Sequence, residues 1–355
     1  MHFIIDARMI NASGIGTYIR NLLREISAKN IFRISCIINE DQKDIILALG
    51  ISEYIIFKSK FFSPYEQIEY LTKLPSADIF WSPHFNSPVF SLRKKIPKRI
   101  VTIHDMFPYA YRDNFKFLSF QYINFLMKRS IFLSDLIFTV SEFSKSEIIK
   151  YLQVPESKIC VVPLGVDPGF SLNQDFIKKD EKYILCVGNV KPHKNIKRAI
   201  EAFNKISEKI SDYELVIVGK SDGFFSPEKG LESVLANNKR IKFTGFVSFD
   251  ELREYYSNAS LLLFPSLYEG FGLPILEAMA FKLPIAASQH ASIPEVGGDN
   301  IIYFNPESEN EIANAILNIL NGKVRCKISS YEENLEKYTW KKCAQKTIEY
   351  IKKIG

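Results

Sequence analysis

The stretch Leu261 to Ala280 reads LLLFPSLYEGFGLPILEAMA, in which two apolar runs flank a short glycine-containing loop. The run Leu261 to Phe264 predicts a buried strand, and Pro274 is well tolerated in the first turn of the helix that follows. Gly270-Phe271-Gly272 predicts a sharp turn between them, because glycine has no Cβ to obstruct the backbone. Free N–H groups at a helix N-terminus, above the end of a parallel strand, form a site for an anion or a polyhydroxylated ligand.

Two carboxylates bracket this turn. Taken singly, Glu269 is interpreted as a solvated loop acid and Glu277 as a residue that favours the helix dipole. Taken together, the run E-G-F-G-L-P-I-L-E resembles the donor-site motif of the GT-B glycosyltransferases, the retaining family 4 in particular. That resemblance implies that Glu269 lies beside the donor sugar and that Glu277 holds the ribose of the nucleotide. It also implies donor contacts by Gly270, Phe271, Gly272 and Leu273.

Length and composition indicate a soluble protein of two domains. The chain has 355 residues, of which 46% are hydrophobic and 24% charged. No apolar run approaches the roughly 20 residues that span a bilayer, and the opening MHFIIDARM predicts a strand and not a signal peptide. Five scattered cysteines without C-x-x-C spacing predict core residues in a reducing cytoplasm.

The net charge and the motifs limit the classes of binding partner that the sequence suggests. The net charge of +6 suits phosphorylated substrates or an anionic membrane surface. Nucleic-acid binding is not indicated, because the sequence has neither a stripe of alternating basic and aromatic residues nor the spacing of zinc ligands. The sequence holds no D-x-D pair, the motif with which the other common glycosyltransferase fold binds a divalent ion. We therefore expect neither a metal nor another cofactor, and we expect side chains and helix ends to neutralise a diphosphate.

Strands alternate with helical stretches in both halves of the chain, which predicts parallel α/β sheets. The boundary falls in the segment Pro163 to Gly169, where proline and glycine interrupt the periodicity. We expect an acceptor-side Rossmann-like domain over residues 1–165 and a nucleotide-sugar-binding one over 166–338. In the resembled fold the two face each other across a cleft, and a terminal helix, here about 339–355, crosses back to the first domain. The predicted strands are His2–Ala7, Arg33–Asn39, Tyr54–Lys58, Ile79–Ser82, Arg99–His104, Leu136–Ser141, Ile159–Val162, Tyr183–Val187, Glu214–Val218, Ile241–Phe243, Ser260–Phe264, Leu283–Ala287 and Ile301–Phe304.

Two segments of the first half carry candidate site residues. Gly14 and Gly16 follow the first strand and precede a helix predicted over Ile19 to Ser27. They predict either a tight turn or, as in the resembled family, a ligand-facing loop. His104 ends a strand at the edge where open α/β sheets bind ligands. The family resemblance places it beside the donor sugar, whereas Asp105 could simply cap the next turn.

The segment from Tyr109 to Arg129 is dense in aromatic and basic residues. The simpler interpretation is an amphipathic helix packed on the sheet. The alternative is a basic aromatic face that lies on the inner face of the plasma membrane or guides a lipid-linked acceptor.

The second half contributes a predicted diphosphate site. Val187 to Asn195 ends a strand and opens a helix, and it contains Lys194 at that helix N-terminus. The segment resembles the family's P-R-K-N variant, in which Lys194 matches the phosphate-binding lysine. His193 and Asn189 stand where relatives carry arginine. Either one charge is lost, or His193 protonates when nucleotide binds, or Lys191 compensates.

Two further loops complete the nucleotide pocket by resemblance. Gly219 follows one strand, and Phe246 and Val247 follow another, where relatives line the base with backbone atoms. Ser248 is placed to cap the next helix. The landmark from Ser292 to Gly298 is expected to be structural.

The resemblance implies a retaining, metal-independent glycosyltransferase of GT-B fold, with His104, Lys194 and Glu269 in catalytic roles. No residue is an obvious covalent nucleophile, so we expect the acceptor proton to pass to the departing phosphate. The donor prediction is GDP-mannose, and the acceptor prediction is a glycan or lipid-linked glycan of bacterial surface polysaccharide such as O-antigen or capsule. The alternatives are a GT-B nucleotide-sugar epimerase and a non-catalytic two-domain sugar-binding protein.

Overall fold

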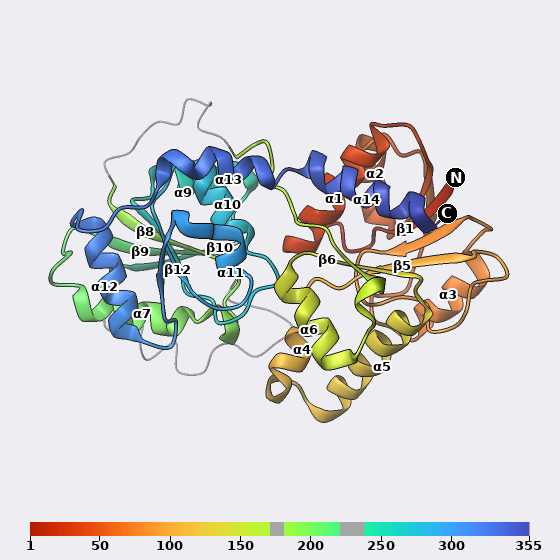
Figure 1. Cartoon of the computed structure of the whole chain (residues 1–355), viewed down its shortest axis with the longest axis horizontal. Coiled ribbons are helices and arrows are strands. Elements are labelled where there is room, and N and C mark those ends of the chain that lie inside the picture. The colour runs from red at the N-terminus through yellow and green to blue at the C-terminus, as the bar shows by residue number, and fades with distance from the viewer. Residues whose placement is uncertain (171–180, 221–237, 355) are drawn as a thin grey trace. The chain divides into compact units, whose positions relative to one another are not determined.

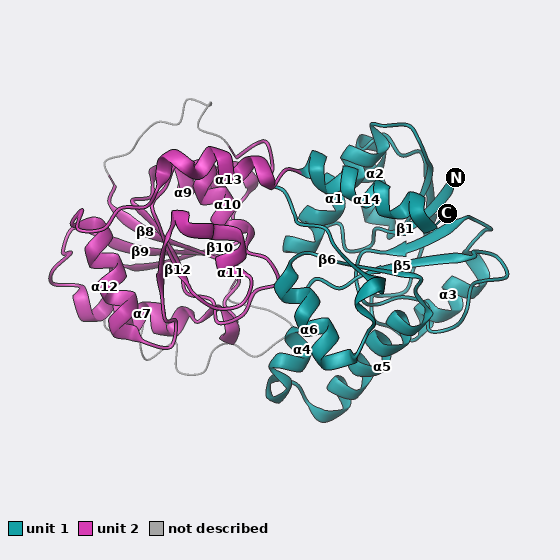
Figure 2. Ribbon diagram, in the orientation of Figure 1, with its two compact units in different colours: residues 1–165, 340–355 teal, residues 166–339 magenta. Residues whose placement is uncertain are grey.

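The computed structural model describes residues 1–170, 181–220 and 238–354. The chain forms two compact units (Figure 2). Unit 1 comprises Met1–Gly165 and Trp340–Gly355, and unit 2 comprises Val166–Thr339. The last helix therefore belongs to the same unit as the first strand.

Unit 1 is built on a seven-stranded sheet in the order β3-β2-β1-β4-β5-β6-β7, and its neighbouring strands pair in parallel (Figure 1). Helix α14 packs against α1, where the Trp340 and Tyr18 rings lie 6.4 Å apart. The strands are β1 (His2–Asp6), β2 (Arg33–Ile38), β3 (Glu53–Ile56), β4 (Ile79–Ser82), β5 (Lys98–Thr102), β6 (Leu136–Thr139) and β7 (Ile159–Val161). The helices are α1 (Ser13–Ser27), α2 (Lys43–Ala48), α3 (Tyr65–Lys73), α4 (Phe107–Ala110), α5 (Phe117–Leu133), α6 (Glu142–Leu152) and α14 (Trp340–Ile354).

Unit 2 repeats this construction on a six-stranded parallel sheet in the order β10-β9-β8-β11-β12-β13. An apolar core lies where α7 and α12 cover the sheet. The strands are β8 (Tyr183–Val187), β9 (Glu214–Val218), β10 (Ile241–Gly245), β11 (Leu261–Phe264), β12 (Ile285–Ser288) and β13 (Ile302–Phe304). The helices are α7 (Ile196–Ile206), α9 (Phe249–Asn258), α10 (Leu273–Ala280), α11 (Ile293–Gly297), α12 (Glu309–Leu320) and α13 (Tyr331–Lys337).

The thirteen predicted strands are present, with ends that differ from the predicted ones by at most two residues. Two helical expectations were wrong in detail. Helix α1 begins at Ser13, so Gly14 and Gly16 lie in its first turn and not in a loop before Ile19. The segment from Tyr109 to Arg129 is not one helix, because α4 ends at Ala110 and α5 begins only at Phe117.

Several local predictions are confirmed. Ser141 caps α6 by accepting a hydrogen bond from the Ser144 N–H, and Ser248 forms a capping box with Glu251 on α9. The Asp105 carboxylate accepts from the Phe107 N–H at 2.9 Å, so it caps the next turn. Four of the five cysteines are buried and all five are free thiols. Within the described ranges, every helix is too short or too polar to cross a membrane.

Candidate active site

In the unit 2 sheet, the direction in which the chain adds new strands reverses between β8 and β11. From β8 the chain adds β9 and β10 on one side, and it then returns to place β11 on the other side of β8. Ligands of open α/β sheets bind beyond the carboxyl ends of the strands at such a switch point. The loops that leave β8 and β11 there contain Lys194 and Glu269.

Lys194 and Glu269 form an ion pair across this point. The Lys194 Nζ lies 2.6 Å from Glu269 Oε1, and both side chains retain some solvent contact. Beneath them, the lysine Nζ lies 5.9 Å from the centre of the Phe264 ring, at the end of β11. The ion pair thus lies beside an aromatic ring and is partly shielded from solvent, where charge interactions are stronger than in bulk water.

Glycine backbones line the same edge. Gly188 and Gly219, which follow β8 and β9, have positive φ values of +147° and +153°. A Cβ at Gly219 would lie 2.2 Å from the Gly188 carbonyl oxygen, so these loops approach more closely than any side chain permits. Gly272 caps α10 with φ +119°, and its conformation turns the chain from the β11 loop into the helix.

The loop from Glu269 to Gly272 is held from below by a buried serine. The Ser292 hydroxyl lies 2.9 Å from the Glu269 carbonyl oxygen and 2.7 Å from that of Phe271. The Phe271 ring also packs edge-on against Tyr338 at 5.6 Å. The segment from Ser292 to Gly298 therefore fixes the loop from beneath, in agreement with its expected structural role.

The Lys194 segment is tied to the same loop. The His193 carbonyl accepts a hydrogen bond from the Leu267 N–H at 2.8 Å. Asn195, the N-cap of α7, donates its side-chain amide to the carbonyls of Pro265 and Pro306. Burial, with further contributions from the charges of Lys194 and Lys191, lowers the pKa of His193 to about 2. The imidazole is therefore neutral near pH 7.

Glu277 lies within α10, where its Oε2 accepts a hydrogen bond from the Tyr256 hydroxyl at 2.6 Å. Burial raises the pKa of Glu277 to about 7, an effect that the Tyr256 hydrogen bond opposes and the charge of Asp167 reinforces. The carboxyl group therefore changes its charge near neutral pH.

The remaining predicted donor residues lie on the β9 side. Asn189 accepts a hydrogen bond from the Lys220 N–H at 3.2 Å, so its side chain joins the loops after β8 and β9. Phe246, next to the half-buried Val247, is 77% exposed, and the Lys220 Nζ lies 5.0 Å from its ring centre. An exposed aromatic ring beside a cation is suited to stack on a planar base.

The other predicted residues belong to unit 1. A Cβ at Gly16 would collide with the Ile10 carbonyl oxygen, whereas one at Gly14 would meet nothing within 4 Å. His104 follows β5, and its Nε2 lies 2.9 Å from the Pro83 carbonyl oxygen. Because a carbonyl only accepts, the proton is on Nε2 and Nδ1 is an acceptor. Burial lowers the pKa of His104 to about 4, so the ring is neutral.

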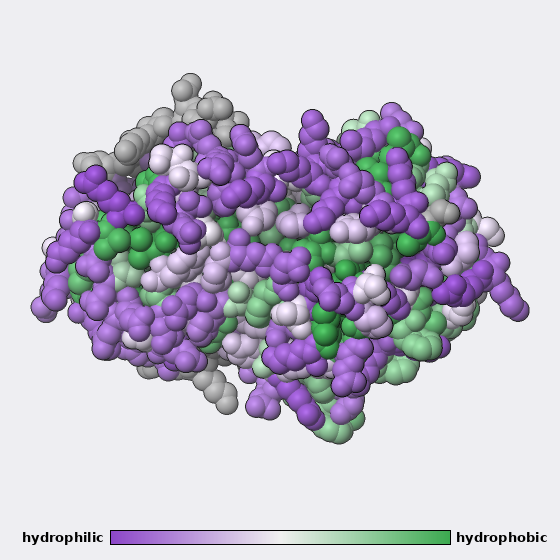
Figure 3. Space-filling model, in the orientation of Figure 1, coloured by the Kyte–Doolittle hydropathy of each residue, from purple (hydrophilic) through white to green (hydrophobic). Residues whose placement is uncertain are grey.

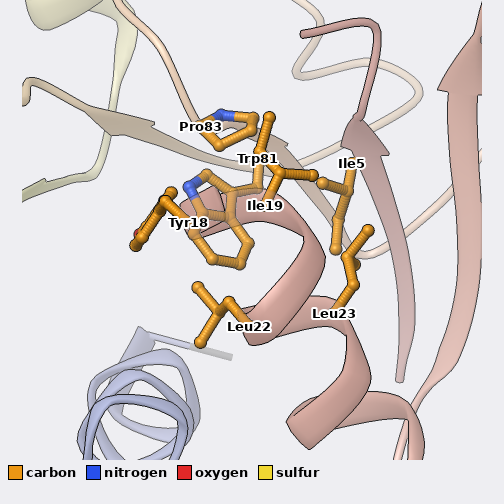
Figure 4. A pocket seen from close by; sticks show the side chains of 7 residues that line it. All are labelled: Ile5, Tyr18, Ile19, Leu22, Leu23, Trp81 and Pro83. Atoms are coloured by element: carbon orange, nitrogen blue, oxygen red, sulfur yellow. The ribbon is translucent and has the colours of Figure 1, made fainter. Parts of the chain in front are cut away.

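Unit 1 also contains a small apolar pocket beside Tyr18 (Figure 4). The Trp81 indole N–H and the Tyr18 hydroxyl both lie within hydrogen-bonding distance of Thr102, at 3.0 and 3.4 Å. Both polar groups are therefore engaged within the core. The pocket is lined by Ile5, Tyr18, Ile19, Leu22, Leu23, Trp81 and Pro83.

In unit 2 the structure brings together Lys194, Glu269 and the glycine backbones, with Glu277 one turn into α10. The sequence interpretation missed Tyr256, which lies 21 residues before its partner Glu277. It also missed Asn195 as the residue that ties the lysine segment to the β11 loop. No local motif identifies either contact, because each joins elements that are distant in the sequence.

Two family models together match most of the chain. Residues 170–341 match the family model described as Glycosyl transferases group 1, and residues 12–170 match that described as Glycosyltransferase Family 4. The chain therefore belongs to the family 4 glycosyltransferases, and its two parallel α/β sheets are the GT-B fold that the sequence predicted.

Individual relatives agree with this assignment. The chain is 37% identical over 223 residues to the O-antigen chain mannosyltransferase RfbU of Salmonella typhimurium, a match that spans 62% of this chain and 60% of that protein. It is 27% identical to the O-antigen chain mannosyltransferase B of Escherichia coli over 76% of this chain and 74% of the other. The solved sucrose-phosphate synthase of Thermosynechococcus elongatus shares the fold, with a TM-score of 0.77 at 18% identity over 99% of this chain and 98% of that one.

Proposed function

We propose that this protein is a retaining, metal-independent glycosyltransferase that moves a hexose from a nucleotide-diphosphate sugar to a hydroxyl group of a glycan. The observation that carries the proposal is the Lys194–Glu269 ion pair of 2.6 Å at the switch point of unit 2. Family membership supports sugar transfer, and the position of the pair supports a donor site in this unit.

The ion pair suggests how the donor is received. A diphosphate is a stronger partner for Lys194 than a single carboxylate, because it carries more charge and more acceptor oxygens. As the lysine turns to the phosphate, the Glu269 carboxylate becomes available to hydroxyl groups of the sugar. Lys194 then opposes the negative charge that grows on the leaving diphosphate as the glycosidic bond breaks.

The backbone of the site has a complementary role. The loops at Gly188 and Gly219 and the N-terminus of α10 after Gly272 let a phosphate approach main-chain N–H groups. Glu277 is placed in the next turn of α10 to accept hydrogen bonds from ribose hydroxyls. We assign the ring of Phe246 to the base.

The donor proposal is GDP-mannose, and the acceptor proposal is a glycan or lipid-linked glycan of a bacterial surface polysaccharide. The names of the two O-antigen chain mannosyltransferases support mannose as the sugar and a surface polysaccharide as the acceptor. A thermal-shift screen of nucleotide sugars tests the donor, because a ligand that binds the folded state raises its stability. We expect the largest shift with GDP-mannose, and a larger shift with a UDP-sugar would overturn that choice.

A second proposal concerns the membrane. The α3–α5 apolar face consists of the exposed side chains Tyr65, Ile68, Leu71, Phe117, Leu118, Phe125 and Phe132. The two helices meet at Val89, whose N–H donates to Gln67 and whose carbonyl accepts from Arg129. Hydrophobic and hydrophilic atoms are mixed over α5 in Figure 3. Lys116, the N-cap of α5, and Lys128 within this helix are both exposed. We propose that this face attaches the enzyme to the cytoplasmic side of an anionic membrane.

A further inference from the structure

The two oxygens of the Glu277 carboxylate have different surroundings. Oε2 accepts a hydrogen bond from the Tyr256 hydroxyl at 2.6 Å, a length typical of an O–H donor and an ionised carboxylate. Oε1 accepts from no other group in the part of the chain that the structure describes, and Glu277 is only half-buried. The protein therefore holds one oxygen, and the other is available to a ligand.

The Tyr256 hydroxyl is held in place by the packing of its ring. Tyr256 lies in α9 and is 1% exposed. Its ring stacks on that of Phe281, the C-cap of α10, with the ring centres 5.9 Å apart and the planes at 5°. Phe170 packs edge-on against Tyr256 at 5.7 Å and against Phe249 of α9 at 5.0 Å. Because rings from three segments enclose the phenol, its oxygen has a fixed position.

A purely structural role for this contact does not require a carboxylate. A buried tyrosine hydroxyl needs one acceptor, and a backbone carbonyl supplies it without charge, as the Gly298 carbonyl does for Tyr303 at 2.7 Å. A carboxylate in the same place adds a desolvation cost. Burial and the charge of Asp167 both raise the pKa of Glu277, and the Tyr256 hydrogen bond opposes them. The tyrosine thus favours the ionised form, whose oxygens only accept hydrogen bonds.

A ribose is a suitable ligand for such a carboxylate. It carries two adjacent hydroxyl groups, at C2′ and C3′, and both can donate to a carboxylate oxygen. An unrestrained glutamate samples several rotamers, so its ordering on binding costs free energy. Because Tyr256 already fixes Oε2 of Glu277, Oε1 is ordered before a nucleotide binds.

We propose that Tyr256 is a positioning residue for the donor nucleotide. Its hydroxyl group fixes the Glu277 carboxylate so that Oε1 accepts hydrogen bonds from the ribose, and the site thereby discriminates ribonucleotides from their deoxy forms. This inference rests on the proposed function and deepens it, because the contact of Glu277 with the ribose is part of that proposal. Tyr256 acts through Glu277, so its effect is on nucleotide affinity and not on the bond-breaking step.

The test compares nucleotides with and without the ribose hydroxyl groups. Tyr256→Phe removes the hydroxyl and keeps the ring. Tyr255→Phe is the matched control, because Tyr255 precedes it in α9 and packs its ring against Tyr183 at 6.3 Å. The probes are GDP and UDP, each with its 2′,3′-dideoxy form, and the Kd values are measured by isothermal titration calorimetry. The comparison uses whichever ribonucleotide binds wild type more tightly.

Wild type and Tyr255→Phe should bind the ribonucleotide about tenfold or more tightly than its dideoxy form, the scale of a hydrogen bond to a charged group. Tyr256→Phe should bind the two forms with Kd values within about threefold of each other. In the Glu277→Ala background, Tyr256→Phe should change the Kd of the ribonucleotide by less than about twofold, because the group that it positions is absent. In steady-state kinetics, Tyr256→Phe should raise the donor KM by about tenfold with little change in kcat.

A Tyr256→Phe variant that retains the wild-type preference for the ribonucleotide, or that weakens both forms equally, would overturn the positioning role. Wild type that binds neither nucleotide, or that shows no preference for the ribose, would overturn it together with the ribose contact of Glu277. If the preference and its loss in Tyr256→Phe are both observed but wild type transfers no sugar from any nucleotide sugar, the proposed function fails and the positioning role stands.

Discussion

Lys194, Glu269 and Glu277 have different proposed roles, and kinetics can separate them. Lys194→Ala removes a charge whose interaction strengthens as the diphosphate leaves, so kcat should fall by on the order of a hundredfold. Glu269→Ala should also lower kcat, because the sugar loses its orientation. Glu277→Ala removes a ribose contact that is the same before and during reaction, so it should mainly raise the donor KM. Steady-state kinetics on the three variants, with circular dichroism to confirm folding, is the measurement.

The outcome that would contradict these roles is the reverse pattern. If Glu277→Ala lost kcat while Lys194→Ala changed only KM, the assignment would be wrong even with the correct fold.

The raised pKa of Glu277 has a consequence for stability. An unfolded glutamate has its ordinary pKa of 4.5, whereas the folded carboxyl titrates at about 7. Between these values the folded state holds a proton that the unfolded state has lost, so stability falls as pH rises through this range. Glu277→Gln keeps the Tyr256 hydrogen bond without the charge. Relative to wild type, the unfolding free energy of the variant should rise by on the order of 1–3 kcal/mol between pH 5 and pH 8. Partial solvent contact of the side chain reduces the size of this difference.

Thermal unfolding at the two pH values tests this prediction. Glu269→Gln is the control, because it makes the same change at a second carboxylate of the site, one that is paired with Lys194. An equal effect of Glu277→Gln at pH 5 and pH 8 would show that the carboxyl is not titrating in this range.

At the scale of elements, Ser292 connects α11 to the loop before α10. The carbonyls of Glu269 and Phe271 share its single hydroxyl proton, so Ser292→Ala removes the donor that both of them face. We expect about 1–2 kcal/mol lower stability and a several-fold lower kcat. Ser308→Ala is the matched control, because Ser308 caps α12. Loss of that cap should lower stability by about 1 kcal/mol without changing the loop before α10. A kcat equally reduced in both variants would mean that lost stability, and not loop position, explains the effect.

Helix α5 carries the membrane prediction. Phe125 and Phe132 are 53% and 73% exposed, one above the other on the α3–α5 apolar face. The protein should float with liposomes that contain acidic lipid, and less so at high salt, because the basic residues are then screened. The double variant Phe125→Ser, Phe132→Ser should at least halve the floating fraction. Ile31→Ser with Val324→Ser, two exposed apolar residues elsewhere, should not. Wild type that stays at the bottom at low salt would show that this face serves another purpose.

The elements differed in how well the sequence predicted them. Strands such as β8 and β11 are continuous apolar runs bounded by glycine or proline, so their positions were predictable. The start of α1 was not, because Gly14 and Gly16 suggest a loop, although close packing on the Ile10 carbonyl makes Gly16 necessary inside the helix. The break before α5 was also missed, because the aromatic content continues unchanged through residues 111–116.

In both units, local motifs could be predicted from the sequence, whereas contacts between distant segments could not. The E-x₇-E run and Lys194 were readable because each motif is local and precedes or begins a helix. The partners that hold them were not, because Tyr256, Ser292 and Asn195 reach the site only through the fold. The buried ion pair of Arg8 with Glu66 in unit 1 is a further case, since the two are separated by 58 residues in the sequence. Only the sheet order brings β1 and α3 together.

Sugar transfer in the presence of excess EDTA tests whether the protein is a metal-independent glycosyltransferase. The donor is the nucleotide sugar that gives the largest thermal shift, the acceptor is mannotriose, and the product is detected by mass spectrometry with and without chelator. We expect wild type to transfer a hexose at the same rate in both conditions and Lys194→Ala to transfer it about a hundredfold more slowly. Release of free nucleotide without transfer, or loss of transfer in EDTA that magnesium or manganese restores, would contradict it.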